Sequence, residues 1–359
     1  SYTDHFTDMI NSVVTVPESP QSVSFNPTQI KDIKASDPGA GINLIEVPQA
    51  NNIGDMRLSY PIEIPPGRVG MQPQLGVSYS SAGGNGWMGL NWSLSIPSID
   101  IHTGWGVPRY DAGLETETYM LGGMLTPLAH RDELQPRSPE KIFHQRVEGS
   151  FQKIVRHGDH PSNYWWEVTD KNGSKSFYGG DPASGLVADA VLTDYNGNIF
   201  KWALRETRDM NGNNVQYRYV QVDDVGLAQG TVVGYDLYIK TIHYTGYQNQ
   251  AGRYKVTFIR DRDLGESRRP DVTISARGGF KQVTADLLRK VEVSFDDQPI
   301  RSYVFNYREG AFHKTLLESI SQLGEDGSHF NTHTFEYFDD ARNVGGGYKG
   351  FDSANNWNT

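Results

Sequence analysis

The chain has 359 residues, with 33 Lys and Arg against 43 Asp and Glu, and a formal net charge of −10. This acidic balance disfavours binding to nucleic acid or to an anionic membrane, and no apolar run approaches the ~18 residues of a membrane-spanning helix. The absence of cysteine excludes disulfides, thiol catalysis and Cys-ligated metal sites, while 38 Gly, 18 Pro and 19 Tyr indicate a β-rich chain with many turns.

Residues 1–50 are polar and interrupted by proline, as in PESP and NPTQ, and predict a lead-in without a core of its own. The chain begins with SYTDHFTDMI, in which no signal peptide is visible. Residues 51–343 alternate between strand and turn patterns and predict one β-domain, with sub-regions of about 51–160 and 161–343 as the alternative. Residues 344–359 are rich in Gly and Asn and are typical of a linker. The predicted fold class is all-β, with successive antiparallel hairpins and meanders forming curved sheets and few helices.

The glycine-rich segment after the strand pattern at Leu75–Tyr79 matches the dinucleotide-binding pattern G-x-G-x-x-G. Dinucleotide binding needs a helix after the glycines, whose N-terminus holds the pyrophosphate, but residues 90–96 read as another strand. We therefore predict a tight turn and no cofactor. The turn residues are Gly83, Gly84, Asn85, Gly86 and Gly89.

Glu115 and Glu117 match the E-x-E pattern of mono-ADP-ribosyltransferases, in which one carboxylate orients the ribose and the other activates the acceptor. The Arg and Ser-Thr-Ser motifs that should precede this pattern are poorly matched by Arg68 and by the Tyr-Ser-Ser at 79–81. We predict instead that both carboxylates lie at the solvated start of a strand that continues through Tyr119, and that the chain has no catalytic site.

Three Asn-Gly pairs predict hairpin turns of type I′, because both central residues of that turn have positive φ. The pairs are Asn172-Gly173, Asn196-Gly197 and Asn211-Gly212. Around the second and third turns, the predicted facing pairs are Val191 with Trp202, Thr193 with Phe200, Leu204 with Tyr219 and Glu206 with Tyr217. The predicted apolar face of this meander consists of Val191, Phe200, Trp202, Leu204, Tyr217 and Tyr219.

The turn segments 194–198 and 209–213 resemble calcium loops, but their glycine stands at position 4 rather than 6 and the closing acid is missing. His157 with His160, and His329 with His333, are spaced like metal ligands, but no acidic cluster accompanies either pair. We predict no metal site, with weak adventitious Ca²⁺ binding as the alternative.

A weak repeat marks the last third of the chain. Three apolar segments align on Ile242, Val291 and Ile320, and each precedes a turn and a strand rich in Tyr and Phe. The unequal spacing of the segments predicts a repeated hairpin rather than an array of fixed period.

One aromatic residue is a candidate for contacting a ligand. Tyr164, Trp166 and Val168 form the apolar face of a predicted strand, which leaves Trp165 on the other face beside Glu167. An aromatic ring beside polar groups can stack on a sugar or on a partner surface. The alternative is that a second layer of protein covers Trp165.

Several longer motifs carry a family resemblance. They are residues 65–81, residues 83–94, GVPRYD at 106–111 and GAFHKTLLESI at 310–320. Over about residues 40–340 the chain resembles the N-terminal domain of the virulence plasmid B protein (SpvB) family, shared with the B component of insecticidal toxin complexes and with Rhs-type proteins. The resemblance implies a non-enzymatic region that in toxin complexes forms part of a hollow β-shell around a toxic C-terminal region. In the virulence protein it precedes a separate ADP-ribosyltransferase domain, which this chain is not expected to contain.

The resulting expectation is a structural or delivery module of a secreted bacterial toxin-like protein. Its expected partners are other domains of its own full-length chain or a subunit of a toxin complex. The alternative is a secreted binding module for carbohydrate or a host surface that uses exposed aromatic residues. Neither hypothesis involves nucleic acid or a membrane span.

Overall fold

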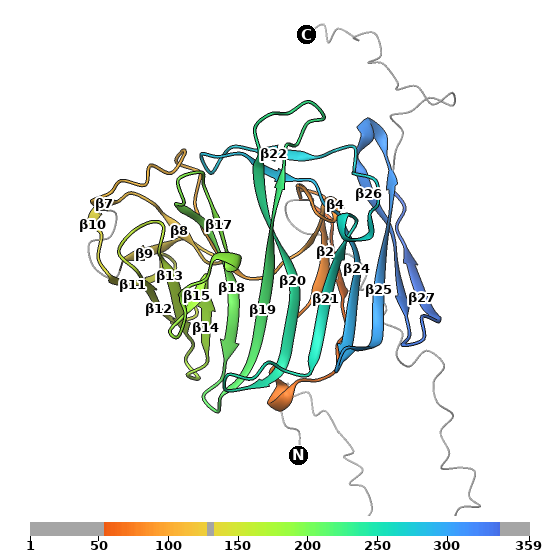
Figure 1. Cartoon of the computed structure of the whole chain (residues 1–359), viewed down its shortest axis with the longest axis horizontal. Coiled ribbons are helices and arrows are strands. Elements are labelled where there is room, and N and C mark those ends of the chain that lie inside the picture. Colours follow the sequence, from red (N-terminus) through yellow and green to blue (C-terminus); the bar gives the residue numbers. More distant parts are fainter. Residues whose placement is uncertain (1–53, 128–132, 338–359) are drawn as a thin grey trace, which may run out of the picture. The chain divides into compact units, whose positions relative to one another are not determined.

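The computed structural model describes residues 54–127 and 133–337, so the predicted lead-in and the predicted linker lie outside it. The described part is built of strands and contains no α-helix (Figure 1). Its helical turns are of the 3₁₀ type: η2 (Arg68–Gly70), η3 (Ala188–Ala190), η4 (Arg262–Leu264) and η5 (Ala311–His313). The predicted all-β fold class with few helices is confirmed. None of the described helices is long and apolar enough to cross a membrane.

A long antiparallel sheet forms the C-terminal part of the fold and runs across Figure 1 from green to blue. Its strands are β18 (Ile199–Arg208), β19 (Asn213–Asp224), β20 (Gly234–Tyr247), β21 (Tyr254–Arg260), β24 (Leu288–Phe295), β25 (Gln298–Glu309), β26 (Thr315–Leu323) and β27 (His329–Thr334). Strand order follows the chain, except that β22 (Thr273–Ser275) and β23 (Gln282–Thr284) leave the sheet between β21 and β24. This hairpin lies beside β20, where Gln282 of β23 pairs in parallel with Tyr235.

The weak repeat corresponds to three hairpins of this sheet, β20–β21, β24–β25 and β26–β27. Ile242, Val291 and Ile320, on which the repeat aligns, are all fully buried on the inner face of the sheet. The repeat therefore marks equivalent core positions in successive hairpins.

A second group of strands forms the yellow and lime lobe of Figure 1 and joins the long sheet at β18. Its paired strands are β6 (Ser98–Ile101), β8 (Tyr119–Met120), β9 (Leu125–Pro127), β11 (Glu140–Gln145), β12 (Lys153–His157), β13 (Trp165–Thr169), β14 (Lys175–Tyr178) and β17 (Val191–Thr193). Two isolated pairs accompany them, β7 (Leu114–Glu115) with β10 (Gln135–Pro136), and β15 (Gly180–Asp181) with β16 (Gly185–Leu186). Strands β6 and β17 flank the first half of β18, and β14 and β19 flank its second half.

The N-terminal strands pack against the inner face of the long sheet. They are β1 (Arg57–Pro61), β2 (Gly76–Ser80) and β5 (Trp92–Leu94), with the short pair β3 (Asn85–Gly86) and β4 (Gly89–Leu90). The Tyr60 ring meets Tyr303 edge-on at 6.2 Å between centroids, and the Trp92 ring lies 4.6 Å from that of Phe335. Aromatic packing of this kind joins the two ends of the described chain into one core.

The three Asn-Gly pairs lie in hairpin turns, but the type I′ assignment is wrong. Only the glycines have positive φ, at 81°, 82° and 88° for Gly173, Gly197 and Gly212. Each turn closes as a three-residue loop; in the second, the Asp194 N–H donates to the Asn198 carbonyl oxygen at 2.8 Å. The Asp194 carboxylate accepts from two backbone N–H groups of its own loop, those of Asn196 and Asn198, and so fixes the loop to its first residue. A pair with positive φ at both residues occurs instead at Asp296-Asp297.

The longer loops shift the predicted register. Val191 pairs with Trp202 as predicted, but Thr193 pairs with Ile199 after a bulge. Glu206 pairs with Gln216, and Leu204 pairs with Tyr178 of β14, so the predicted partners Tyr217 and Tyr219 are wrong. The six residues of the predicted apolar face are nevertheless all buried. Burial does not reveal the shift, because both faces of the sheet are covered around β18.

Candidate functional site

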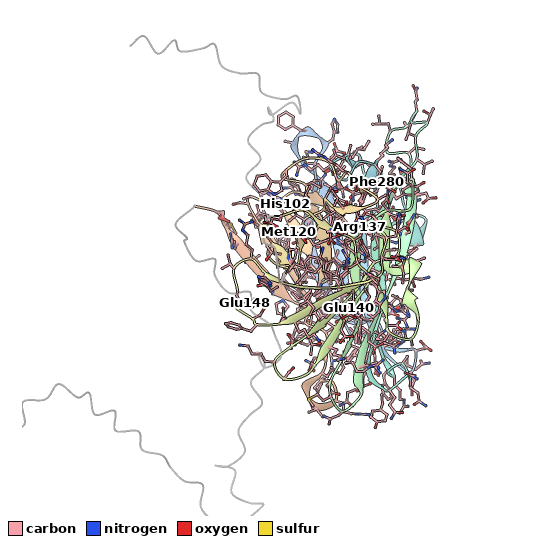
Figure 2. The ribbon with its side chains drawn as sticks, turned by 90° about the vertical axis from the view of Figure 1, so that its left-hand side faces the viewer. His102, Met120, Arg137, Glu140, Glu148 and Phe280 are labelled. Atoms are coloured by element: carbon pink, nitrogen blue, oxygen red, sulfur yellow. The ribbon has the colours of Figure 1, made fainter. Side chains whose placement is uncertain are left out.

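The Glu115–Glu117 motif forms a buried ion network in the lobe, so its predicted solvated position is wrong. The Glu115 and Glu117 side chains are 4% and 1% exposed. Arg137 donates to both Glu117 carboxylate oxygens, at 3.1 and 3.0 Å, while Lys141 and Arg156 pair with Glu115. Figure 2 turns this lobe toward the viewer and labels Arg137. Buried carboxylates need such partners because leaving water costs several kcal/mol per ion.

Two tyrosines complete the ion network. The Tyr119 hydroxyl donates to Glu115 at 3.0 Å, and the Arg137 guanidinium donates to the Tyr164 hydroxyl at 3.0 Å. The Arg156 guanidinium lies 3.8 Å from the centre of the Tyr164 ring and donates to the Ser138 carbonyl oxygen at 2.9 Å. Burial lowers the pKa of Arg156, and burial together with the Arg137 charge lowers the pKa of Lys141. Both carboxylates are thus engaged in holding buried cations.

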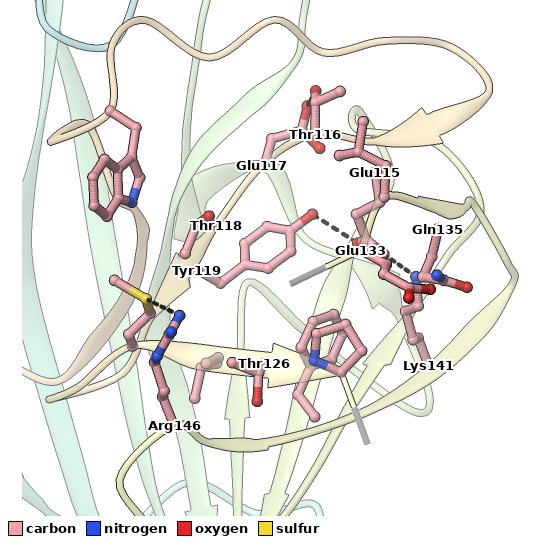
Figure 3. Close-up of a pocket in the computed structure, with 16 residues that line it drawn as sticks. Glu115, Thr116, Glu117, Thr118, Tyr119, Thr126, Glu133, Gln135, Lys141 and Arg146 are labelled. Carbon is pink, nitrogen blue, oxygen red and sulfur yellow. Dashed lines mark hydrogen bonds and ion pairs between the residues drawn. The ribbon is translucent and has the colours of Figure 1, made fainter. Parts of the chain in front are cut away.

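A hollow of about 280 Å³ opens above this ion network (Figure 3). Its lining is partly aromatic, partly polar and partly charged: Tyr119 and Phe143, Thr116, Thr118, Thr126 and Gln135, and Glu133, Lys141 and Arg146. Trp105 belongs to the same lining and is 80% exposed. Our sequence reasoning missed Trp105, although its position between Gly104 and Gly106 was a usable signal for a displayed side chain.

Trp165 and Glu167, the predicted ligand contacts, lie on β13 away from this hollow. The Trp165 ring is half-buried and stacks on the His157 imidazole, with centroids 4.1 Å apart and planes 15° from parallel. Glu167 pairs with Lys175 at 2.8 Å. Burial lowers the pKa of His157, against the attraction of Glu140 and Glu167. One face of Trp165 is therefore covered by the imidazole, and its role as a ligand contact stays a prediction.

The glycine-rich segment fastens the N-terminal strands to distant parts of the chain. The Asn85 side-chain amide donates to the backbone and carboxylate oxygens of Asp271 at 2.9 and 3.0 Å. The buried Arg269 donates to the Gly86 carbonyl oxygen at 2.5 Å, and Asp271 accepts from the Thr315 N–H at 2.8 Å. Gly89 has a φ of 81°, and a Cβ there would lie 2.6 Å from the Thr315 carbonyl oxygen. We call the set Asn85, Gly86, Arg269, Asp271 and Thr315 the clasp.

The candidate metal ligands take part in other interactions. Asp194 and Asp209 accept hydrogen bonds from their own turns, which engage the oxygens that Ca²⁺ would need. His160 contacts Ser162, and His329 contacts Thr332. Across residues 54–127 and 133–337, no group of three or more His, Asp or Glu side chains is arranged to hold a metal.

The long sheet ends in an open edge beside an apolar groove. Within the described residues, β27 pairs with β26 alone. The groove of about 690 Å³ beside it is lined mainly by Leu58, Tyr79, Trp92, Leu316, Phe335 and Tyr337. An open strand edge and an adjoining apolar groove are the features through which a further strand can be added to a sheet.

Sequence comparison decides the family of the chain. Residues 50–264 match the family model described as Salmonella virulence plasmid 65kDa B protein, SpvB. The chain belongs to the SpvB family. Relatives called mono(ADP-ribosyl)transferase SpvB, from Salmonella typhimurium (strain 14028s / SGSC 2262) and Salmonella choleraesuis (strain SC-B67), are 28% identical over 165 residues. The match covers 42% of this chain and 27% of those relatives, so it spans about a quarter of their length.

Solved structures share the fold of this SpvB-family chain. The N-terminal domain of effector protein SpvB from Salmonella typhimurium strain LT2 superposes with a TM-score of 0.60 at 20% identity. That match covers 77% of this chain and 98% of the domain. A crystal structure of TcdB2-TccC3 superposes with a TM-score of 0.64 at 20% identity, over 77% of this chain and 15% of the other. The chain thus has the fold of the SpvB N-terminal domain, and TcdB2-TccC3 shares this fold over part of its length.

Proposed function

We propose that this chain is a non-enzymatic structural or delivery module of a secreted bacterial toxin-like protein. In this proposal, residues 51–343 form one wall of a β-shell that carries or precedes a toxic C-terminal region. Membership of the SpvB family and the fold shared with TcdB2-TccC3 support the toxin context. The open edge of β27 supports the structural role, because a wall must be continued by further strands.

The occupant that we propose for the β27 edge is a following strand of a longer chain of this protein. The groove beside β27 presents Trp92, Phe335 and Tyr337, which provide an apolar seat for the side chains of such a strand. The relatives extend far beyond the matched region, and TcdB2-TccC3 is more than six times as long as the part that this fold covers. A binding module would need no such continuation at the end of its sheet.

Hydrogen exchange tests this docking. The outward-facing amides of β27 should exchange at least tenfold more slowly in a protein that carries the proposed C-terminal region than in the 359-residue chain, because added strands satisfy and bury them. Amides of β25, which is flanked on both sides in either form, provide the control and should not change. Equal exchange of β27 in the two proteins would contradict the proposal.

The proposal includes the absence of ADP-ribosyltransferase activity. Glu115 and Glu117 neutralise buried cations, so neither carboxylate is free to orient a ribose or activate an acceptor. We expect the purified chain to show neither NAD hydrolysis nor label transfer to an acceptor protein such as actin. Turnover above background that disappears in Glu117→Gln would overturn this part of the proposal.

A further inference from the structure

A second pocket lies where the N-terminal strands meet β18, β20 and β23. Its volume is about 390 Å³, which is enough to hold a small organic group. Several separate parts of the chain line it: Gly86 with Trp87, residues 94–98, Lys201 with Ala203, Tyr219, residues 236–238, and Thr284. The pocket is therefore a product of tertiary folding and not of a single loop.

Asp236 places a carboxylate at this pocket without a cationic partner. Its oxygens accept from the Thr284 hydroxyl at 2.6 Å and from the Leu237 N–H at 2.9 Å. Within the described part of the chain, Asp236 forms no ion pair with any lysine, arginine or histidine. Burial raises the pKa of Asp236, against these two hydrogen bonds and the attraction of Lys201. The carboxylate is thus fixed in position, but its charge is not neutralised.

The cations nearest to Asp236 and Tyr238 are engaged with other acids. Lys201, which lines the pocket, pairs with Asp100 at 3.4 Å. The Arg260 guanidinium lies 5.5 Å from the centre of the Tyr238 ring, and it pairs with Asp263 and Asp286, each at 2.8 Å. One negative charge, that of Asp236, is left without a counter-charge.

The Tyr238 hydroxyl is a second group with unused hydrogen-bonding capacity. Tyr238 is 4% exposed, and its hydroxyl is buried without a hydrogen-bond partner among the described residues. Asp236 and Tyr238 are two positions apart on β20, so their side chains lie on the same face of the strand. Burial together with the Asp236 charge raises the pKa of Tyr238. A group with several N–H donors can bond to both oxygens.

The Trp87 ring forms an aromatic wall next to this pair. It is half-buried, and its centroid lies 5.6 Å from that of the Tyr238 ring. The face of an indole ring attracts cations. Apolar side chains continue the lining beyond it, namely Leu94, Ile96, Pro97 and Ala203. An acid, an unpartnered hydroxyl and an aromatic wall beside apolar surface suit a cation that carries an apolar chain.

We infer that this pocket binds a primary ammonium group with an alkyl stem. The ammonium donates to the Asp236 carboxylate and the Tyr238 hydroxyl and lies against the Trp87 ring, while the stem packs on the apolar lining. A free aliphatic amine and a lysine side chain share this chemistry. The inference does not depend on the shell role proposed above, because the pocket is separate from the β27 edge.

Ligand-observed NMR titrations of the 359-residue chain with butylamine and with Nα-acetyl-lysine methylamide test the inference. At least one of the two should bind, and 1-butanol, which has the stem without the charge, should not. Binding of the lysine derivative alone assigns the pocket to a lysine side chain, and binding of butylamine assigns it to free amines as well. Asp236→Asn should weaken binding at least about tenfold, because it keeps the acceptor for Leu237 but removes the charge. Tyr238→Phe should weaken it about threefold to tenfold through the loss of one hydrogen bond.

Asp223→Asn is the matched control for the change of charge. Asp223 is exposed on β19 and pairs with Tyr235, so it faces the opposite side of the sheet from Asp236, and its variant should bind as the unaltered chain does. Urea unfolding checks that each variant folds, and Tyr238→Phe tests the site if Asp236→Asn does not fold. Three results would overturn the inference: no binding of either amine, equal binding of 1-butanol, or equal losses in Asp223→Asn and Asp236→Asn.

Discussion

The lobe around Glu115 and the long sheet around Ile242 solve the same packing problem by different means. The sheet has strands of up to 14 residues with aliphatic side chains at its centre, and its buried ion pair of Arg260 with Asp286 lies where β21 ends. In the lobe, β7, β8 and β10 have two residues each, and a buried ion network holds them together. Strands of two residues form too few backbone hydrogen bonds to hold their positions, and in the lobe directional hydrogen bonds between charged side chains hold them instead.

The buried ion network should make the lobe more sensitive to single substitutions than the sheet is. Aliphatic contacts in the sheet tolerate small shifts of the side chains. A buried charged group that loses its partner of opposite charge, in contrast, strongly destabilises the folded protein. We therefore expect single substitutions of network residues to be more harmful than truncations of core aliphatic residues in the sheet.

Arg156→Ala should lower the free energy of unfolding by about 3–5 kcal/mol, because the buried Glu115 carboxylate loses one of its two cationic partners. Urea denaturation followed by circular dichroism measures this loss. Lys175→Ala, which breaks the half-exposed pair with Glu167 in the same lobe, is the control and should cost about 1 kcal/mol or less. Equal losses in the two variants would show that the network is not the main support of the lobe.

Leu317→Ala in β26 should cost about 2–5 kcal/mol, because it leaves a cavity among fully buried side chains. Leu264→Ala, at a position that is 53% exposed, should change stability by less than about 0.5 kcal/mol. The same urea titrations compare both variants with Arg156→Ala. A larger loss for Leu317→Ala than for Arg156→Ala would reverse the ranking of the two regions.

Asp271→Asn should cost about 1.5–3 kcal/mol at pH 7, because the clasp loses its charged hydrogen bonds. Burial alone would raise the pKa of Asp271, but hydrogen bonds from Arg269 and Thr315 outweigh it and hold the pKa below its usual range. A lowered folded-state pKa gives stabilisation that is present above about pH 4 and is lost as the pH falls through the folded-state value. The variant should therefore lose less stability than the unaltered chain between about pH 4 and pH 2. Parallel acid-denaturation curves for the two proteins would contradict this account.

Gly197→Ala should cost about 1–2 kcal/mol, because alanine is strained at a φ of 82°. Gly84→Ala, at a glycine without positive φ and with no atom within 4 Å of the position that a Cβ would take, should be neutral to within about 0.5 kcal/mol. Thermal unfolding of both variants separates the two glycines. A costly Gly84→Ala would show that the glycine-rich segment has a constraint beyond the contacts of the clasp.

The sequence predicted the sheet better than the lobe, for a physical reason. An apolar pattern reports burial, and its repetition located the hairpins around Ile242, Val291 and Ile320. It carries no information on loop length, so Glu206 was assigned to the wrong partner by one residue. The ion network was missed because Glu117, Arg137 and Arg156 meet only through tertiary folding. The sequence around Glu117 does not indicate that Arg137, 20 residues later, is its partner. Trp105 was missed because exposure of a single ring depends on what the rest of the lobe leaves uncovered.

The clasp has a consequence for the order in which the molecule can fold. Asn85 bonds to Asp271, which lies 186 residues later in the chain, and Trp92 bonds to Tyr337, which lies 245 residues later. During synthesis the N-terminal strands emerge first but cannot bury their aromatic rings until β26 and β27 have been made. Contacts of such sequence separation make folding slow and leave apolar strands uncovered meanwhile. We therefore expect apolar surface of the first strands to stay exposed until the last hairpin is complete, and removing that hairpin should leave these strands aggregation-prone.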